Sequence, residues 1–218
     1  MTSQTIAIAG GHGQIALILE RLLVDAGHTV IGIIRNPDHV GDVEATGASA
    51  LVLDLEQTDA ATLVAKIPGV DVLVFAAGGG ASSGAARKLT VDRDAAVLLA
   101  DAAELAGIRR LLVISAMKTD EFDPDSDDVF QIYLRAKSEA DAVIRDRDRD
   151  LDWTIIRPGG LTNDAPTGGV NISQSLEPGT IPRADVAALI ATLIETGRGA
   201  RDQFEVISGA TPIADALD

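Results

Sequence analysis

Cysteine is absent from this chain of 218 residues, and its absence removes several kinds of chemistry at once. There can be no disulfide, no thiolate nucleophile and no cysteine-based metal site. Histidine is scarce as well, and the three that occur (His12, His28 and His39) have no spacing that predicts a metal site. No apolar run approaches the ~20 residues of a membrane span. We therefore expect a cytoplasmic protein with no metal and no membrane partner.

Positive charge is also in short supply. The chain has 33 acidic and 18 basic residues, which gives a formal net charge of -15. Such a surface repels a phosphate backbone, so we expect no nucleic-acid partner. A polyanionic ligand would have to be held locally, by helix dipoles and backbone amides. With 46% apolar and 23% charged residues, the composition is typical of a globular domain.

Short apolar runs alternate with amphipathic stretches along the whole chain. Their continuous Ile, Val and Leu character is typical of parallel strands that are covered on both faces. The pattern predicts one α/β domain over residues 1–218, with a doubly wound, mostly parallel sheet. The predicted strands are Thr5–Ala9, Thr29–Ile34, Ala50–Leu53, Val70–Phe75, Arg109–Ile114, Trp153–Arg157 and Phe204–Ile207.

The helices between these strands are predicted from apolar residues at helical spacing. The predicted buried positions are Ile15, Leu19, Leu22 and Leu23 on one helix, and Val97, Leu98, Ala102 and Leu105 on another. Gly27 and Gly107 follow these helices, where a left-handed residue is favoured. The last predicted helix is Arg183–Thr196. Before it, residues 159–182 are rich in Gly, Thr, Asn and Ser, so we expect a substrate-side loop region that forms a small C-terminal decoration.

A glycine-rich turn follows the first predicted strand and opens the first helix. Its sequence is Gly10-Gly11-His12-Gly13-Gln14-Ile15-Ala16. A tight turn needs a residue that can adopt positive φ, and a pyrophosphate approaches the backbone only where side chains are absent. In this context the turn predicts a dinucleotide site, with the diphosphate on the helix N-terminus. The alternative is a turn whose glycines serve geometry only.

Cofactor choice is predicted from the end of the second strand, where Arg35 and Asn36 stand in place of an acidic residue. An acidic residue there accepts from the ribose 2′-hydroxyl of NAD, whereas arginine pairs with a 2′-phosphate. We therefore expect NADP(H) to be preferred, with NAD(H) as the other cofactor. The alternative for Arg35 is a solvated side chain at the start of a loop.

Landmarks over nearly the whole chain carry a family resemblance. They are IAIAGGHGQIA, IIRNPDHV, LDL, VFAAGGG, LLVISAM, YLRAKSEAD, TIIRPGGLTND and IPRADVAALI, in this order. The chain resembles the atypical short-chain dehydrogenase/reductases of the NmrA-like, NAD(P)H-binding type, which also resemble NAD-dependent epimerase/dehydratases. The resemblance implies a Rossmann fold. It also implies cofactor contacts from Asp54 and Leu55 at the adenine, from Ala76, Ala77 and Gly78 at the ribose, and from Pro158.

The resemblance further implies a catalytic set of Ser115, Tyr133 and Lys137. Tyr133 and Lys137 are four residues apart, which places them on one helical face. An ammonium beside a phenol lowers the phenol's pKa, so Tyr133 could exchange a proton with a substrate oxygen while a nicotinamide exchanges hydride. Lys137 would also hold the ribose hydroxyls, and Ser115 would hydrogen-bond the substrate oxygen. The alternatives are a half-buried aromatic side chain for Tyr133 and a local backbone contact for Ser115.

These residues predict an NAD(P)H-dependent oxidoreductase, monomeric or homodimeric, that reduces a small carbonyl, quinone or flavin-like acceptor. We expect the substrate to be enclosed by residues 78–83, 115–118 and 159–177, since ligands lie beyond the carboxyl ends of the strands. Two alternatives remain open. One is a redox sensor that binds NADP(H) without catalysis. The other is a sugar-nucleotide epimerase or dehydratase, for which the roughly 60 residues after Pro158 are few.

Overall fold

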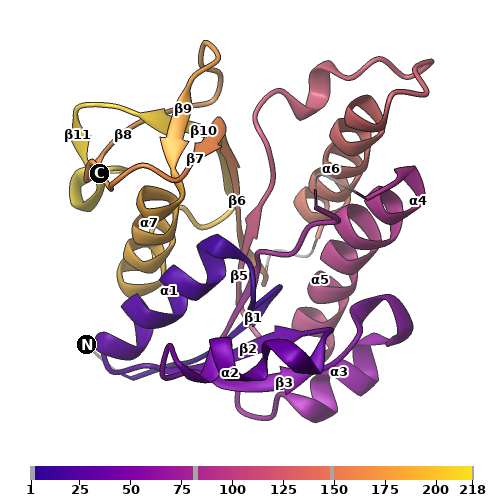
Figure 1. Ribbon diagram of the computed structural model, residues 1–218, viewed down its shortest axis with the longest axis vertical. Coiled ribbons are helices and arrows are strands. Elements are labelled where there is room, and N and C mark those ends of the chain that lie inside the picture. Colours follow the sequence, from indigo (N-terminus) through magenta and orange to yellow (C-terminus); the bar gives the residue numbers. More distant parts are fainter. Residues whose placement is uncertain (1–2, 81–82, 148–149, 218) are drawn as a thin grey trace.

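The computed structural model describes residues 3–80, 83–147 and 150–217. Within them, a nine-stranded sheet forms the centre of the molecule (Figure 1). From one edge to the other its strands are β11 (Thr211–Pro212), β8 (Gly169–Ser173), β10 (Asp202–Ser208), β6 (Asp152–Pro158), β5 (Arg110–Ile114), β4 (Val72–Phe75), β1 (Thr5–Ala9), β2 (Thr29–Ile34) and β3 (Ser49–Val52). The strands from β10 to β3 are parallel, which confirms the predicted doubly wound α/β fold of Rossmann type.

The chain order of the strands reverses between β1 and β4, which are neighbours in the sheet. From β1 the chain winds outward to β2 and β3, and from β4 it winds the other way to β5 and β6. Ligands of open α/β sheets bind at the carboxyl ends of the strands at such a reversal. The topology therefore places the site beyond Ala9 and Phe75.

Helices cover both faces of the sheet (Figure 1). On one face lie α1 (Gln14–Asp25), α2 (Val40–Glu44) and α7 (Arg183–Thr196), and on the other α3 (Ala60–Lys66), α5 (Ala95–Ala106) and α6 (Val129–Arg145). Helix α4 (Ala85–Arg87) leads into a π-helix, Lys88–Asp94, which continues into α5. No helix in the described ranges has both the length and the apolar character that crossing a membrane requires.

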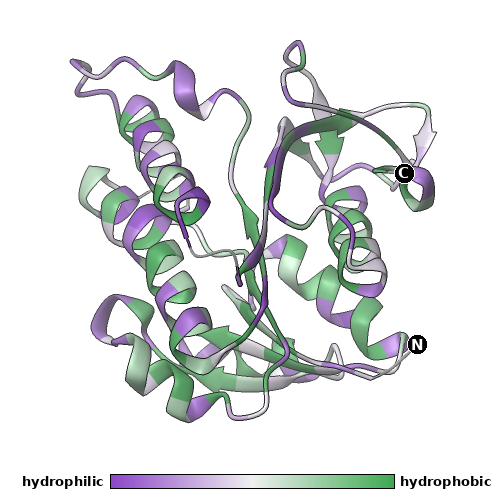
Figure 2. Cartoon of the chain, turned by 180° about the vertical axis from the view of Figure 1, so that it is seen from behind, coloured by the Kyte–Doolittle hydropathy of each residue, from purple (hydrophilic) through white to green (hydrophobic). Residues whose placement is uncertain are grey.

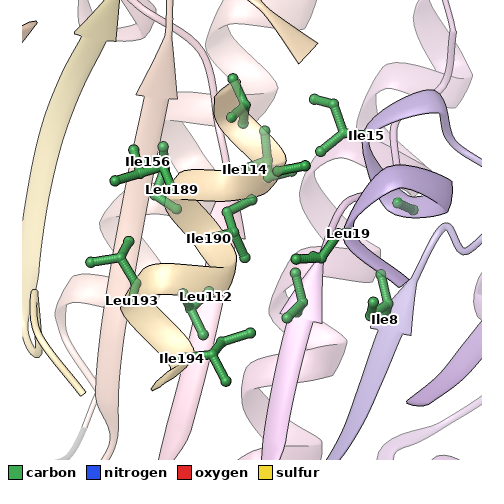
Figure 3. Close-up of a cluster of buried hydrophobic side chains, with 14 of the residues drawn as sticks. Ile8, Ile15, Leu19, Leu112, Ile114, Ile156, Leu189, Ile190, Leu193 and Ile194 are labelled. Carbon is green, nitrogen blue, oxygen red and sulfur yellow. The ribbon is translucent and has the colours of Figure 1, made fainter. Parts of the chain in front are cut away.

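Two apolar clusters hold these layers together. In Figure 3, Leu19 of α1 and Ile190 of α7 lie beside Ile8 and Leu112 of the sheet, in a cluster that also contains Leu193. The second cluster joins the opposite face of the same strands to α3, α5 and α6. The central strands β1, β4, β5 and β6 are thus buried on both faces, as their uninterrupted apolar runs predicted, whereas β3 and β11 at the sheet edges are partly exposed. Figure 2 shows the central strands mainly green, whereas the connection leading into α6 is mainly purple.

The C-terminal decoration differs from the expected loop region. Residues 159–182 contain β7 (Gly160–Thr162), β8 and β9 (Thr180–Pro182). Strand β8 pairs with β10 and β11 at the sheet edge, while β7 and β9 form a separate parallel pair. Backbone pairing satisfies polar groups of this segment, and Val170 and Ile181 anchor it in the core even though most of its side chains are small or polar.

Candidate functional site

Two adjoining cavities lie at the reversal point of the sheet. The first has a volume of about 310 Å³ and extends from the Gly10–Gly13 turn toward Arg35 and Asp54. The second has a volume of about 570 Å³ and reaches the ends of β5 and α6. Residues 76–78, which follow β4, line both of them. A long ligand could therefore cross from one cavity to the other over the small side chains of Ala76, Ala77 and Gly78.

The turn after β1 has room for backbone only. Gly10 has a φ of 83°, and a Cβ atom on it would lie 2.6 Å from the Cα of Ala77. A Cβ on Gly11 would lie 2.7 Å from the Cα of Gly32. The amides of Gly10 and Gly11 both donate to the carbonyl of Ile33, which fixes the turn against β2. Glycine at these positions is thus required by the fold as well as by any ligand.

The N-terminus of α1 opens beside this turn without a protein side chain to cap it. Its N-cap is Gly13, which makes no side-chain hydrogen bond, and its first turn holds no acidic residue. The first amides of the helix and its dipole therefore remain available to an anion. A dinucleotide's diphosphate fits this arrangement, because the backbone is bare at Gly10 and Gly13 and positively polarised at the helix start.

Two arginines meet one glutamate at the far end of the first cavity. The Oε2 atom of Glu56 accepts from Arg35 at 3.2 Å and from Arg87 at 2.9 Å, and Oε1 accepts from Thr90 at 2.6 Å. Partial burial opposes ionisation, but these hydrogen bonds and both guanidinium charges hold the pKa of Glu56 below its usual range. Arg35 is therefore not merely solvated, since it forms part of a charged cluster that includes Arg87.

Two of the three histidines lie together, which their positions in the sequence did not indicate. His12 and His39 stack with ring centroids 3.6 Å apart, and both line the first cavity. His12 also contacts Asp42 at 2.8 Å. Their convergence was missed because the helical turn after β2 folds back over the glycine-rich turn. In the described residues, no three histidine or acidic side chains gather as potential metal ligands.

Ser115, Tyr133 and Lys137 all line the second cavity. No hydrogen bond joins the Tyr133 hydroxyl to another described residue. Burial raises the pKa of Tyr133 above its usual value, and the negative charges of Asp92 and Asp141 raise it further. The expectation that Lys137 lowers the pKa of Tyr133 is therefore wrong for the protein without a bound cofactor. Tyr133 is therefore a protonated hydroxyl at neutral pH, suited to donate a proton.

Lys137 is directed to partners other than Tyr133. Its Nζ atom donates to the carbonyl of Ile114 at 2.9 Å and lies 3.7 Å from Oδ1 of Asp92. Complete burial lowers the pKa of Lys137, although Asp92 and Asp141 oppose this shift. The ammonium thus links the end of β5 to the π-helix.

Ser115 belongs to a buried polar network behind the cavity. Its hydroxyl donates to Oδ2 of Asp141 at 2.8 Å, and Arg157 Nε donates to the same oxygen at 2.8 Å. Arg157 also donates to both carboxylate oxygens of Asp120. Burial raises the pKa of Asp141, whereas Arg157 and Ser115 favour its ionised form. The other oxygen of Asp141 is buried and has no hydrogen-bond partner.

The structure brings most of the predicted site residues to one of the two cavities. Those at the first cavity are Gly10, His12, Gly13, Arg35, Asn36, Asp54, Leu55, Ala76, Ala77 and Gly78. Those at the second include Ile15, Ser115, Tyr133 and Lys137. Three predicted cofactor residues line neither cavity: Gly11, Gln14 and Pro158. Asp54 and Asn36 cap helical turns, since their carboxylate and amide oxygens accept from Glu56 and Asp38 amides.

The predicted substrate enclosure is reproduced only in part. Gly78, Gly80, Ser115 and Leu161 line the second cavity, whereas most of residues 159–177 lie away from it. Residues 81 and 82 fall outside the described ranges. The remaining wall comes instead from the π-helix and from the start of α6.

Several residues at the site were missed from the sequence. They are Glu56 and Arg87 in the first cavity, and Lys88, Asp92, Val129 and Phe130 in the second. The sequence could have indicated Asp141, because it lies four residues after Lys137, just as Lys137 lies four residues after Tyr133, so all three share one face of a helix. The sequence could also have indicated Arg157, because it is a charged residue near the end of an otherwise apolar strand.

Comparisons with known proteins agree with this geometry. Residues 10–196 match the model of the NAD(P)H-binding family. The uncharacterized sugar epimerase YhfK of Bacillus subtilis is 34% identical over 213 residues, which cover 97% of this chain and 98% of that protein. A structure from Bacillus halodurans described as an NAD-dependent epimerase/dehydratase is 30% identical, with a TM-score of 0.88 and 99% of both chains covered. The oxidoreductase YlbE of Lactococcus lactis is 26% identical with a TM-score of 0.84, and the match covers 98% of this chain and 94% of YlbE.

Proposed function

Because the chain belongs to the NAD(P)H-binding family, we propose that it is an NAD(P)H-dependent oxidoreductase that reduces a small carbonyl, quinone or flavin-like acceptor. One observation carries the proposal. The hydroxyl of Tyr133, which hydrogen-bonds to no described residue, lies in a cavity that adjoins the cavity of the glycine-rich turn at residues 76–78. A proton donor and a dinucleotide site would therefore face the same space.

The fit of a dinucleotide rests on the glycine-rich turn. Gly10 and Gly13 expose backbone, and the uncapped start of α1 offers its amides to the diphosphate. Asp54 and Leu55 would lie along the adenosine half, and Arg35 and Arg87 would face a 2′-phosphate. When bound, the nicotinamide would supply or accept a hydride.

The chain's own residues would manage the proton. Tyr133 is kept protonated by burial and by its acidic neighbours, so its hydroxyl would donate to the substrate oxygen as hydride reaches the adjacent atom. Lys137 would keep the end of β5 and the π-helix in register through Ile114 and Asp92. Ser115 would accept a hydrogen bond from the reduced substrate, because its own proton is held by Asp141.

A screen of NADPH oxidation against quinones, flavins and aldehydes tests this function. Consumption of NADPH that depends on both enzyme and acceptor supports it. Tight NADPH binding without turnover of any acceptor favours the second candidate, a redox sensor that binds the cofactor without catalysis. The observation that favours this second candidate is that Lys137 contacts Asp92 and does not contact Tyr133.

A further inference from the structure

The second cavity contains a lysine that the proposed chemistry does not use. Lys88, the first residue of the π-helix, is only 6% exposed and lines the same cavity as Tyr133. Its Nζ atom donates to the carbonyl of Gly80 at 2.7 Å and lies 5.2 Å from the centre of the Tyr133 ring. An ammonium has three N–H donors, so Gly80 leaves two of them without a protein acceptor among the described residues.

The carboxylate one helical turn away does not neutralise Lys88. The Oδ2 atom of Asp92 accepts from the amide of Gly79 at 3.0 Å, and its Oδ1 atom lies 3.7 Å from Lys137 Nζ. Over the described part of the chain, Lys88 forms no ion pair with any carboxylate. A buried ammonium without a counter-charge is costly, and an anion bound in the cavity would remove that cost.

Apolar side chains form much of the rest of the cavity wall. Ile114 and Leu161 contribute to it, as do Val129 and Phe130 at the start of α6. The side of the cavity at Phe130 is open to solvent, since Phe130 is 61% exposed and its ring centre lies 6.0 Å from that of Tyr133. An exposed aromatic beside a cavity offers a flat ligand a surface on which to stack.

We propose that Lys88 is the anion-binding group of this cavity, and that the substrate is a flat, largely apolar molecule with one carboxylate. The two donors of Lys88 that no described residue accepts match the two oxygens of a carboxylate. The net charge of -15 opposes the binding of an anion in general, so a local cation such as Lys88 would determine where in this cavity the carboxylate lies. The inference rests on the proposed function in one respect, because it takes this cavity as the substrate site.

The test uses two probes that differ in charge and hardly in shape, 2-naphthoate and 2-naphthamide. Their dissociation constants are measured by calorimetry on protein saturated with NADP⁺, which keeps the probes out of the first cavity. We expect the naphthoate to bind about tenfold more tightly than the amide, as one charge-assisted hydrogen bond allows. Lys88→Met should abolish this preference without weakening amide binding, and Lys88→Arg should retain it.

Lys66→Met is the matched control, since Lys66 is an exposed lysine of α3 and lies outside the cavity. Thermal unfolding and NADP⁺ titration establish that each variant is folded, and Lys88→Gln replaces Lys88→Met if the latter is not. Equal affinities of the two probes for the wild type, or no binding of either, overturn the inference. Equal losses for both probes in Lys88→Met, or a loss of NADP⁺ affinity alone, also overturn it. An intact charge preference without any NADPH oxidation refutes the oxidoreductase function and leaves the Lys88 site standing.

Discussion

The hydroxyl of Ser115 donates to Oδ2 of Asp141 at 2.8 Å, and this bond commits the only proton that the serine has. While Asp141 is ionised, Ser115 offers the cavity its lone pairs and no donor. In this arrangement Ser115 has no proton left to donate, so the hydrogen bond to the substrate oxygen that the family resemblance implies would be one that Ser115 accepts. In the proposed reaction, Ser115 would accept from the alcohol product, and Tyr133 would be the donor to the carbonyl oxygen.

The same contact predicts that Asp141 contributes strongly to stability. Asp141→Ala leaves Arg157 buried with only Asp120 as its counter-charge, and we expect the free energy of unfolding to fall by about 3 kcal/mol. Ser115→Ala removes one hydrogen bond and should cost about 1 kcal/mol. Urea unfolding of both variants measures these losses. Asp125→Asn, an exposed substitution in the connection before α6, is the control and should change little. A loss for Asp141→Ala no larger than the control's would contradict the predicted role of the network.

Most strands of the sheet could be predicted from the sequence, because continuous runs of Ile, Val and Leu are typical of parallel strands that are covered on both faces. Strands β1 and β2 and helix α7 have the expected bounds. The buried face of α5 was predicted only in part: Ala102 is buried as expected, whereas Leu105 is 60% exposed and Ala96 and Ala103 are buried in its place. Small side chains let this helix lie close to the sheet, and close packing outweighs the hydrophobicity of single residues.

The electrostatics of the site could not be read from the sequence. The pKa of Tyr133 depends on burial and on the charges of Asp92 and Asp141, and Asp92 lies 41 positions before Tyr133 in a π-helix. A π-helix changes which residues share a face, so ordinary helical spacing does not predict its contacts. The link between Ser115 and Asp141 likewise joins a strand end to a helix through the tertiary fold.

The cluster around Glu56 predicts a cofactor preference. We expect NADPH to bind more tightly than NADH, because Arg35 and Arg87 can pair with a 2′-phosphate. Arg35→Ala should remove most of a roughly ten- to hundredfold preference, and Arg87→Ala should reduce it as well. Calorimetric titration with both cofactors measures this. Arg21→Ala, at an exposed position of α1, should leave the ratio unchanged. Equal affinities of the wild type for NADPH and NADH would exclude the assignment.

Glu20 predicts an unusual dependence of stability on pH. It is fully buried in α1, Thr46 donates to one carboxylate oxygen, and the other oxygen has no partner. Burial raises its pKa from 4.5 to about 7, against smaller opposing effects of Thr46 and Arg21. The folded protein therefore binds a proton that the unfolded chain releases, so this contribution to stability is lost as pH rises from about 4.5 to about 7.

Glu20→Gln should remove this loss, because glutamine is neutral at every pH. Relative to the variant, the wild type should become less stable by up to about 3 kcal/mol between pH 4.5 and pH 8. The measurement is the difference in unfolding free energy between the two proteins across this range. Glu44→Gln, at the exposed end of α2, should show no such trend. A difference between wild type and Glu20→Gln that is constant with pH would refute the assignment.

A substitution at Tyr133 distinguishes an enzyme from a protein that only binds the cofactor. Tyr133→Phe removes one hydroxyl, and because that hydroxyl bonds to no described residue, folding and NADPH affinity should remain close to wild type. Loss of a positioned proton donor lowers turnover by about 10²–10⁴-fold. Since burial and acidic neighbours raise the pKa of Tyr133, the wild-type rate of reduction should not fall between pH 6 and pH 9 through ionisation of this phenol.

Lys137 provides the comparison that makes the Tyr133 result interpretable. Lys137→Met leaves Asp92 buried without its ammonium, so this variant should lose stability and cofactor affinity as well as turnover. The catalytic function thus predicts two different patterns: a rate effect alone for Tyr133→Phe, and a broad effect for Lys137→Met. A cofactor-binding sensor predicts that Tyr133→Phe is neutral in every assay. Both variants are compared by turnover with one active acceptor and by NADPH titration. If Tyr133→Phe turns over at the wild-type rate, Tyr133 is not the proton donor.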